Sequence, residues 1–105
     1  KQLMSYHPNL LSLSSKIRRS ENSLSAEVDD ALVLMSIEKG NYYSLDAIGA
    51  DIWRRLERRI AVSELCEILG EEYDADPETI RRDVLALLDA LAKECLIEIL
   101  PDPTA

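Results

Sequence analysis

Apolar and polar positions alternate along the first half of the chain, which is typical of β-strands. Leu24, Ala26 and Val28 are separated by polar residues, and this spacing predicts a half-buried strand. An apolar run over residues 32–37 follows the Asp29-Asp30 turn signal, and a return strand over residues 42–45 follows Gly40, which suits a hairpin bend. The pattern therefore predicts a three-stranded antiparallel meander.

The apolar spacing changes to a helical period after residue 45. Asp46 is a suitable N-cap for an amphipathic helix over residues 47–58, and a second apolar stripe runs from Val62 to Tyr73. Asp76 and Pro77 mark the start of a third helix. One face of that helix carries Ile80, Val84, Leu87, Leu88, Leu91 and Cys95. Residues 96–100 are apolar enough for a short last strand.

Strands followed by helices, with two helices joined by a short turn, indicate an α+β domain. We expect a winged-helix-like fold, in which a three-stranded antiparallel sheet is followed by three helices. With 105 residues the chain has room for one domain. We place an extended N-terminal arm at residues 1–22, the domain at 23–100 and a disordered tail at 101–105.

Composition excludes several classes of protein. The chain has two cysteines and one histidine, His7, which cannot form a zinc ligand set or a disulfide framework. The three glycines are far apart, so there is no glycine-rich phosphate loop. No apolar run is long enough to cross a membrane. We therefore expect a cytoplasmic protein that is not an enzyme and uses no cofactor.

Charge argues against DNA, the ligand that a helix-turn-helix suggests. The net charge is −8, and residues 46–105 hold fifteen acidic and seven basic side chains. Eight acidic residues and only three basic ones lie between residues 71 and 94, where a recognition helix would meet phosphates. The one basic cluster, Arg54, Arg55, Arg58 and Arg59, lies on the first predicted helix. A DNA-binding regulator is kept as the alternative.

The return strand has the composition of a peptide-binding edge. Its residues, Asn41, Tyr42, Tyr43, Ser44 and Leu45, include no proline, lysine or other charge that would block strand addition. We expect a peptide to pair with this strand in a groove beside the third helix. Three residues on one flank of that helix are expected to wall the groove: Arg81, Leu85 and Leu88.

Four segments in this order resemble the coenzyme-PQQ biosynthesis protein D family, whose members are precursor peptide recognition elements of ribosomally made, modified peptides (RiPPs). They are residues 40–53 (GNYYSLDAIGADIW), 71–78 (EEYDADPE), 82–85 (RDVL) and 96–97 (LI). Within the family the chain is most similar to the stand-alone B1 proteins of lasso-peptide clusters. The resemblance implies a non-catalytic protein that holds a precursor's leader peptide and presents it to modifying enzymes.

The implied partners are the precursor leader peptide and, for a lasso pathway, a leader protease and a cyclase. Leaders in this family are often lysine-rich, which suits the acidic surface. We expect no nucleic acid and no membrane as partners. Two alternatives stay open beside DNA binding: the chain is a recognition domain excised from a larger modifying enzyme, or two copies form a homodimer by strand or arm exchange.

Overall fold

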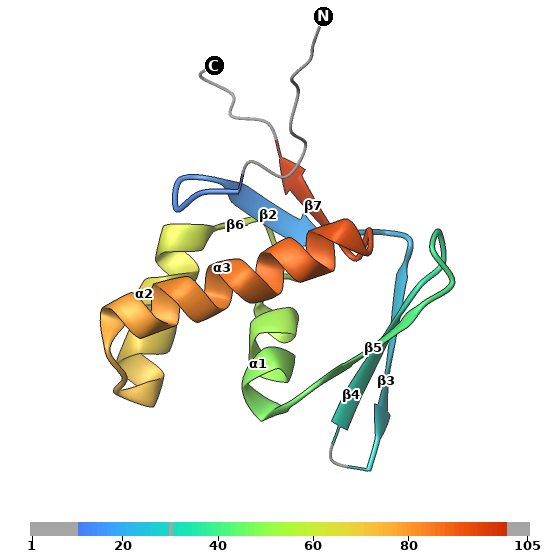
Figure 1. The fold of residues 1–105 in the computed structure, drawn as a ribbon, viewed down its shortest axis with the longest axis horizontal. Coiled ribbons are helices and arrows are strands. Elements are labelled where there is room, and N and C mark those ends of the chain that lie inside the picture. The colour runs from blue at the N-terminus through green and yellow to red at the C-terminus, as the bar shows by residue number, and fades with distance from the viewer. Residues whose placement is uncertain (1–10, 30, 101–105) are drawn as a thin grey trace, which may run out of the picture.

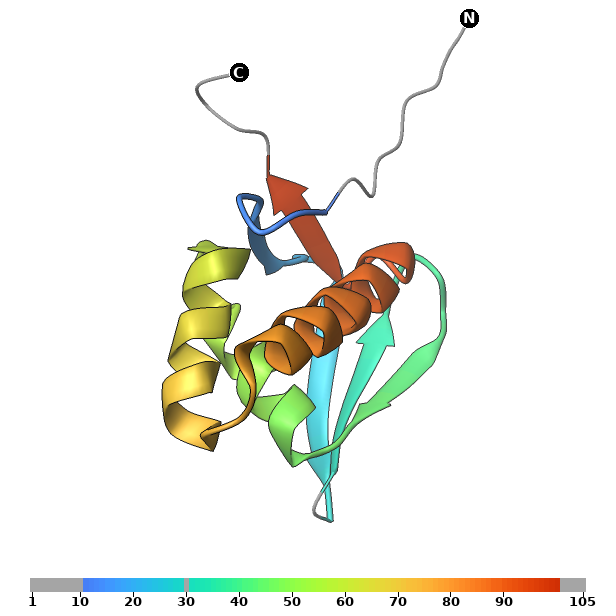
Figure 2. The same ribbon diagram turned by 60° about the vertical axis from the view of Figure 1, so that its left-hand side comes forward.

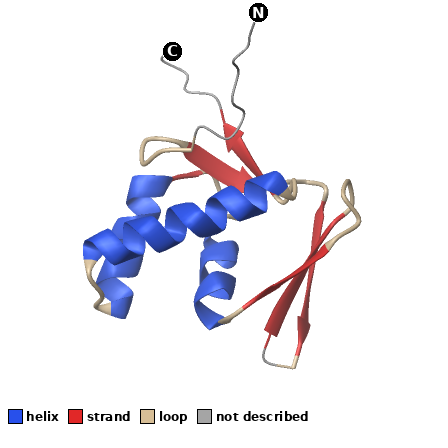
Figure 3. Ribbon diagram, in the orientation of Figure 1, coloured by secondary structure: helices blue, strands red, loops and turns tan. Residues whose placement is uncertain are grey.

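Three helices pack with two small β-sheets in this computed structural model, which describes residues 11–29 and 31–100. The order is β2 (Lys16–Arg19), β3 (Ser23–Val28), β4 (Ala31–Ser36), β5 (Tyr42–Leu45), α1 (Ala47–Arg55), β6 (Ile60–Ala61), α2 (Val62–Tyr73), α3 (Pro77–Lys93) and β7 (Ile97–Leu100). The strands form two antiparallel sheets, β3-β4-β5 and β6-β2-β7. The α3 helix crosses the middle of the molecule, with the β3-β4-β5 meander on one side and α2 on the other (Figures 1 and 3).

The helices begin and end where local chemistry dictates. The Asp46 carboxylate accepts a hydrogen bond from the Gly49 N–H at 2.8 Å and caps α1, and Asp76 accepts one from the Thr79 N–H at 3.1 Å and caps α3. After α3 the chain turns at Cys95, whose φ is +60°. There the Leu96 N–H donates to the Leu91 carbonyl at 2.9 Å, which satisfies a carbonyl at the end of the helix.

The α+β class, the meander and the three helices are confirmed, but the sequence prediction missed one sheet. The second sheet combines β2, the two-residue strand β6 and β7. The predicted first helix also ends earlier, at Arg55 rather than at residue 58.

The predicted boundary between arm and domain is wrong for residues 16–22. The middle strand of the second sheet is β2, and Ile17 within it is fully buried in the core. Arg19 also contacts α1. Its Nε donates to the Trp53 carbonyl at 3.0 Å, and its guanidinium lies 5.0 Å from the centre of the Trp53 ring. Residues 11–15 also contact the domain, because the Val62 N–H donates to the Ser15 carbonyl at 2.9 Å and Leu11 packs against the core. Residues 1–10 of the predicted arm, and the predicted tail at 101–105, lie outside the described residues.

The β3 strand is present, but its apolar face is not half-buried. The register pairs Leu24 with Met35 and Ala26 with Val33, so these side chains share the face of the sheet opposite to buried Leu34. No element among the described residues covers that outer face, since Leu24 is 55% and Val28 53% exposed. The opposite face packs on the helices, because Leu32, Leu34 and Leu45 belong to the common core, and α1 lies beside the meander (Figures 1 and 2).

Candidate functional site

The outer edge of β5 is open. Within the described residues β5 pairs with β4 along one edge and with no strand along the other. At the start of this pairing the Ser36 N–H donates to the Asn41 carbonyl at 3.0 Å, which marks Ser36 and Asn41 as a hydrogen-bonded pair. Hydrogen-bonded and non-bonded pairs alternate along an antiparallel ladder. Tyr42 and Ser44 therefore direct their backbone N–H and C=O groups to the open edge.

A groove follows this open edge. It has a volume of about 410 Å³ and lies between β5, the first half of α1, the end of α2 and α3. Its floor is apolar and made by core side chains that are at most 9% exposed: Leu45, Ile52, Leu69, Ile80 and Val84. Half-buried Tyr43 and Leu87 line one end, and Tyr73, Ala75 and Thr79 line the other. A strand added to β5 would place alternate side chains over this floor.

The wall on α3 is the flank opposite to the predicted one. Leu88 is fully buried and Leu85 is half-buried against the core, and neither lines the groove. Arg81 forms an ion pair with Glu78 and lines a separate hollow between α2 and α3. At about 100° per residue, Asp83 and Leu87 lie on the other side of the buried stripe, and these two line the groove.

The structure therefore brings together only part of the predicted site. Tyr43, Ser44 and Leu45 line the groove. Tyr42 is 73% exposed and belongs to the open edge through its backbone. The Asn41 side-chain amide donates to Glu94 Oε1 at 2.9 Å, so Asn41 ties the hairpin to the end of α3 instead of facing the groove.

Sequence reasoning missed much of the groove wall, including Ile48, Tyr73, Asp83 and Leu87. Ile48 is 49% and Tyr73 40% exposed, although both lie on helical stripes that the sequence assigns to the core. For Ile48 and Tyr73, the only sequence signal of a place in the groove wall was a large apolar side chain at the end of a predicted stripe. That signal does not distinguish a core position from a groove wall.

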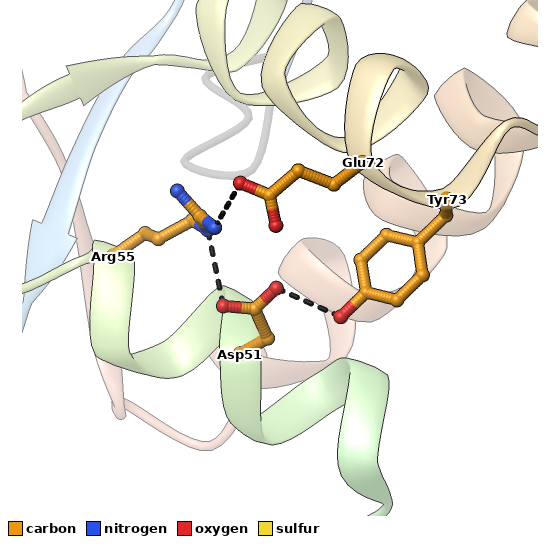
Figure 4. A network of polar contacts seen from close by, with 4 residues as sticks. All are labelled: Asp51, Arg55, Glu72 and Tyr73. Carbon is orange, nitrogen blue, oxygen red and sulfur yellow. Dashed lines mark hydrogen bonds and ion pairs between the residues drawn. The ribbon is translucent and has the colours of Figure 1, made fainter.

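A polar network joins α1 to α2 beside the groove, and its member Tyr73 lines the groove. The Tyr73 hydroxyl donates to Asp51 Oδ2 at 2.8 Å, and Arg55 Nε donates to Asp51 Oδ1 at 3.1 Å (Figure 4). The Arg55 guanidinium also donates to Glu72 Oε2 at 2.6 Å. The hydrogen bond to Asp51 raises the pKa of the Tyr73 phenol above its ordinary value. Ionisation would remove the proton that the hydroxyl donates and would leave a negative phenolate facing a carboxylate.

The charges around the groove are acidic. Its only charged lining residues in the described part of the chain are Asp46 and Asp83. The arginine cluster that could have met DNA is divided, because Arg54 pairs with Glu27 at 3.4 Å and Arg55 with Asp51. Two further arginines, Arg58 and Arg59, lie beyond the last residue of α1. The four arginines thus form no single helical face for a phosphate backbone.

The described part of the chain holds no group of three or more His, Cys, Asp or Glu side chains that could bind a metal ion. No helix in it is long and apolar enough to cross a membrane. His7 lies outside the described residues. Cys66 is 8% exposed, and its burial raises the pKa of the thiol, which keeps it in the unreactive neutral form.

Comparison with known proteins identifies the family. The family model of coenzyme PQQ synthesis protein D (PqqD) matches residues 31–97, which include β4, β5, the groove and all three helices. The chain belongs to the PqqD family. A relative, the bifunctional coenzyme PQQ synthesis protein C/D of Methylorubrum extorquens, is 35% identical over 72 residues, which are 69% of this chain and 19% of that protein. This PqqD-family chain thus spans about a fifth of that relative.

Three solved structures share the fold. TbiB1, in complex with the TbiA(beta) leader peptide, is 37% identical with a TM-score of 0.69, over 81% of this chain and 99% of that one. The PqqD part of PqqCD from Methylobacterium extorquens, a stand-alone RiPP recognition element, is 29% identical with a TM-score of 0.72, over 87% and 97%. A lasso peptide synthetase B1 complexed with the leader peptide is 26% identical with a TM-score of 0.68, over 81% and 98%.

Proposed function

We propose that this PqqD-family domain binds the leader region of a ribosomally made precursor peptide by adding it as a strand to the open edge of β5. The observation that carries the proposal is the open edge itself, because it lies directly beside an apolar groove. The exposed backbone groups of Tyr42 and Ser44 supply sequence-independent hydrogen bonds, and the groove floor selects apolar side chains. Two of the structural relatives, TbiB1 and the lasso B1 protein, were solved with leader peptides, which supports this function.

The domain performs no chemistry on the peptide in this proposal. It holds the leader while partner enzymes act on the rest of the precursor, and a lasso-type leader protease and cyclase are the favoured partners. A leader with lysines would meet a protein of net charge −8, with Asp46 and Asp83 beside the groove. Such attraction mainly accelerates association and weakens as salt is added.

Proline substitution of one edge residue tests the site. Ser44→Pro removes an outward N–H and puts a ring where the added strand would lie. We expect at least a tenfold loss of affinity in calorimetric titration with the TbiA(beta) leader, the peptide in the structure of TbiB1.

The meander supplies a matched control in Ser25→Pro, on the open edge of β3. The Ile37 N–H donates to the Asn22 carbonyl at 2.9 Å, so by the same alternation the Ser25 N–H also faces outward. We expect Ser25→Pro to bind within twofold of the unmodified protein. Equal affinities for the two variants, with thermal unfolding unchanged, would place the leader elsewhere.

A further inference from the structure

Tyr73 occupies a position in the groove that packing alone does not fix. It is the last residue of α2, and the chain leaves the helix at Asp74, whose φ is +47°. Its ring lines the groove yet stays 40% exposed. A half-exposed side chain at a helix end would ordinarily sample several rotamers, so a further contact is needed to hold this ring in place.

The contact that holds it is the hydrogen bond from its hydroxyl to Asp51 Oδ2 at 2.8 Å. Asp51 cannot swing away, because Arg55 binds its other oxygen at 3.1 Å, and Arg55 is itself bound to Glu72 at 2.6 Å. Figure 4 shows the chain of contacts closing between α1 and α2, with the Tyr73 ring at one end. Arg55 already joins the two helices, so the bond to Tyr73 is not needed for that purpose.

We propose that Tyr73 is a specificity-determining residue that closes the α2 end of the groove, and that Asp51 is the positioning residue that holds it closed. This inference rests on leader binding along β5. With the ring fixed, the hollow over Ile52 and Leu69 takes an aliphatic side chain of the leader and excludes an aromatic one. The groove thereby selects leaders by the size of one side chain.

Removing the Tyr73 hydroxyl distinguishes a positioned wall from a side chain that only fills space. Tyr73→Phe keeps the ring and removes only the bond to Asp51, whereas Tyr73→Ala removes the wall. Arg54→Gln is the control, because it removes a polar contact of α1, the ion pair with Glu27 at 3.4 Å, and Arg54 does not line the groove. A Tyr73 that only filled space would give the same selectivity with Tyr or Phe.

The test is a size scan of the leader, in which each apolar position is changed in turn to Leu, Phe and Trp and titrated against each protein. In the unmodified protein we expect one position where Trp binds at least tenfold more weakly than Leu, a typical penalty for a misfit in an apolar pocket. Tyr73→Ala should reduce that ratio at least fivefold, Tyr73→Phe should reduce it by about half or more, and Arg54→Gln should leave it unchanged.

A double-variant comparison tests the positioning role of Asp51. Asp51→Ala alone should lower the ratio of the dissociation constants of the Trp and Leu leaders. Added to Tyr73→Phe, it should cause no further change in that ratio. If Tyr73→Ala keeps the full ratio while the leader still binds, the specificity proposal is refuted and leader binding stands. If the unmodified protein binds no leader, the proposed function itself is refuted.

Discussion

Truncating Ile17 should destabilise the whole domain, although the residue lies in a segment that the sequence pattern assigns to an arm. Its side chain is fully buried, and its backbone pairs with Ile60 on one side and Ile99 on the other. Replacing a buried isoleucine with alanine costs about 2–5 kcal/mol, because apolar burial is lost and a cavity remains. Small domains have a total stability of only about 5–15 kcal/mol, so Ile17→Ala should remove a large part of it.

Urea denaturation followed by circular dichroism measures this loss. We expect the free energy of unfolding to fall by about 3 kcal/mol and the Tm by about 10–20 °C. Lys16→Ala is the matched control in the same strand, and as an exposed substitution it should change stability by less than about 0.5 kcal/mol. A loss below about 1 kcal/mol for Ile17→Ala would refute the placement of β2 in the core.

Three further substitutions or reactions test other features of the fold. Cys95→Gly should raise the unfolding free energy by about 1 kcal/mol in thermal denaturation, because φ is +60° there and glycine adopts it without strain; a destabilised variant would contradict the helix end described above. Cys66, whose thiol pKa is raised by burial, should react with a maleimide at pH 8 only after denaturation, whereas Cys95 reacts in the folded protein, and mass spectrometry of digested samples distinguishes the two sites. Leu24→Ser should cost less than about 0.5 kcal/mol, because Leu24 is 55% exposed, and a cost above 2 kcal/mol would show that the outer face is covered.

The sequence predicted those elements whose determinants are local. Asp46 and Asp76 cap helices through bonds to residues three positions ahead, and the stripe on α3 is read within that helix alone. Strand β2 could not be found in this way. Its partners lie more than 40 residues away, and Ile17 stands as a single apolar residue between Lys16 and Arg18.

The prediction of the groove agrees with the structure only where it depended on one strand, and the role of these residues in binding stays a prediction. The uncharged composition of residues 41–45 indicated an open edge, and the structure places that edge beside the groove. Choosing between Leu85 and Leu87 as the groove wall required knowing which flank of α3 faces β5. The two flanks are nearly equivalent in apolar character, and only tertiary packing distinguishes them.

The exposed apolar face of β3 shows a related limit. Alternation of Leu24, Ala26 and Val28 correctly predicts a strand whose apolar residues share one face. It does not predict whether another element covers that face, because covering depends on where the helices pack.

The measurement that tests leader binding along β5 most directly is an amide chemical-shift titration of the ¹⁵N-labelled protein with the leader peptide. Strand addition predicts the largest shifts at residues 42–45, with smaller ones on α3 near Asp83 and Leu87. Arg81 on the opposite flank should change little. Shifts confined to the end of α1 around Arg54, with residues 42–45 unchanged, would contradict strand addition at β5.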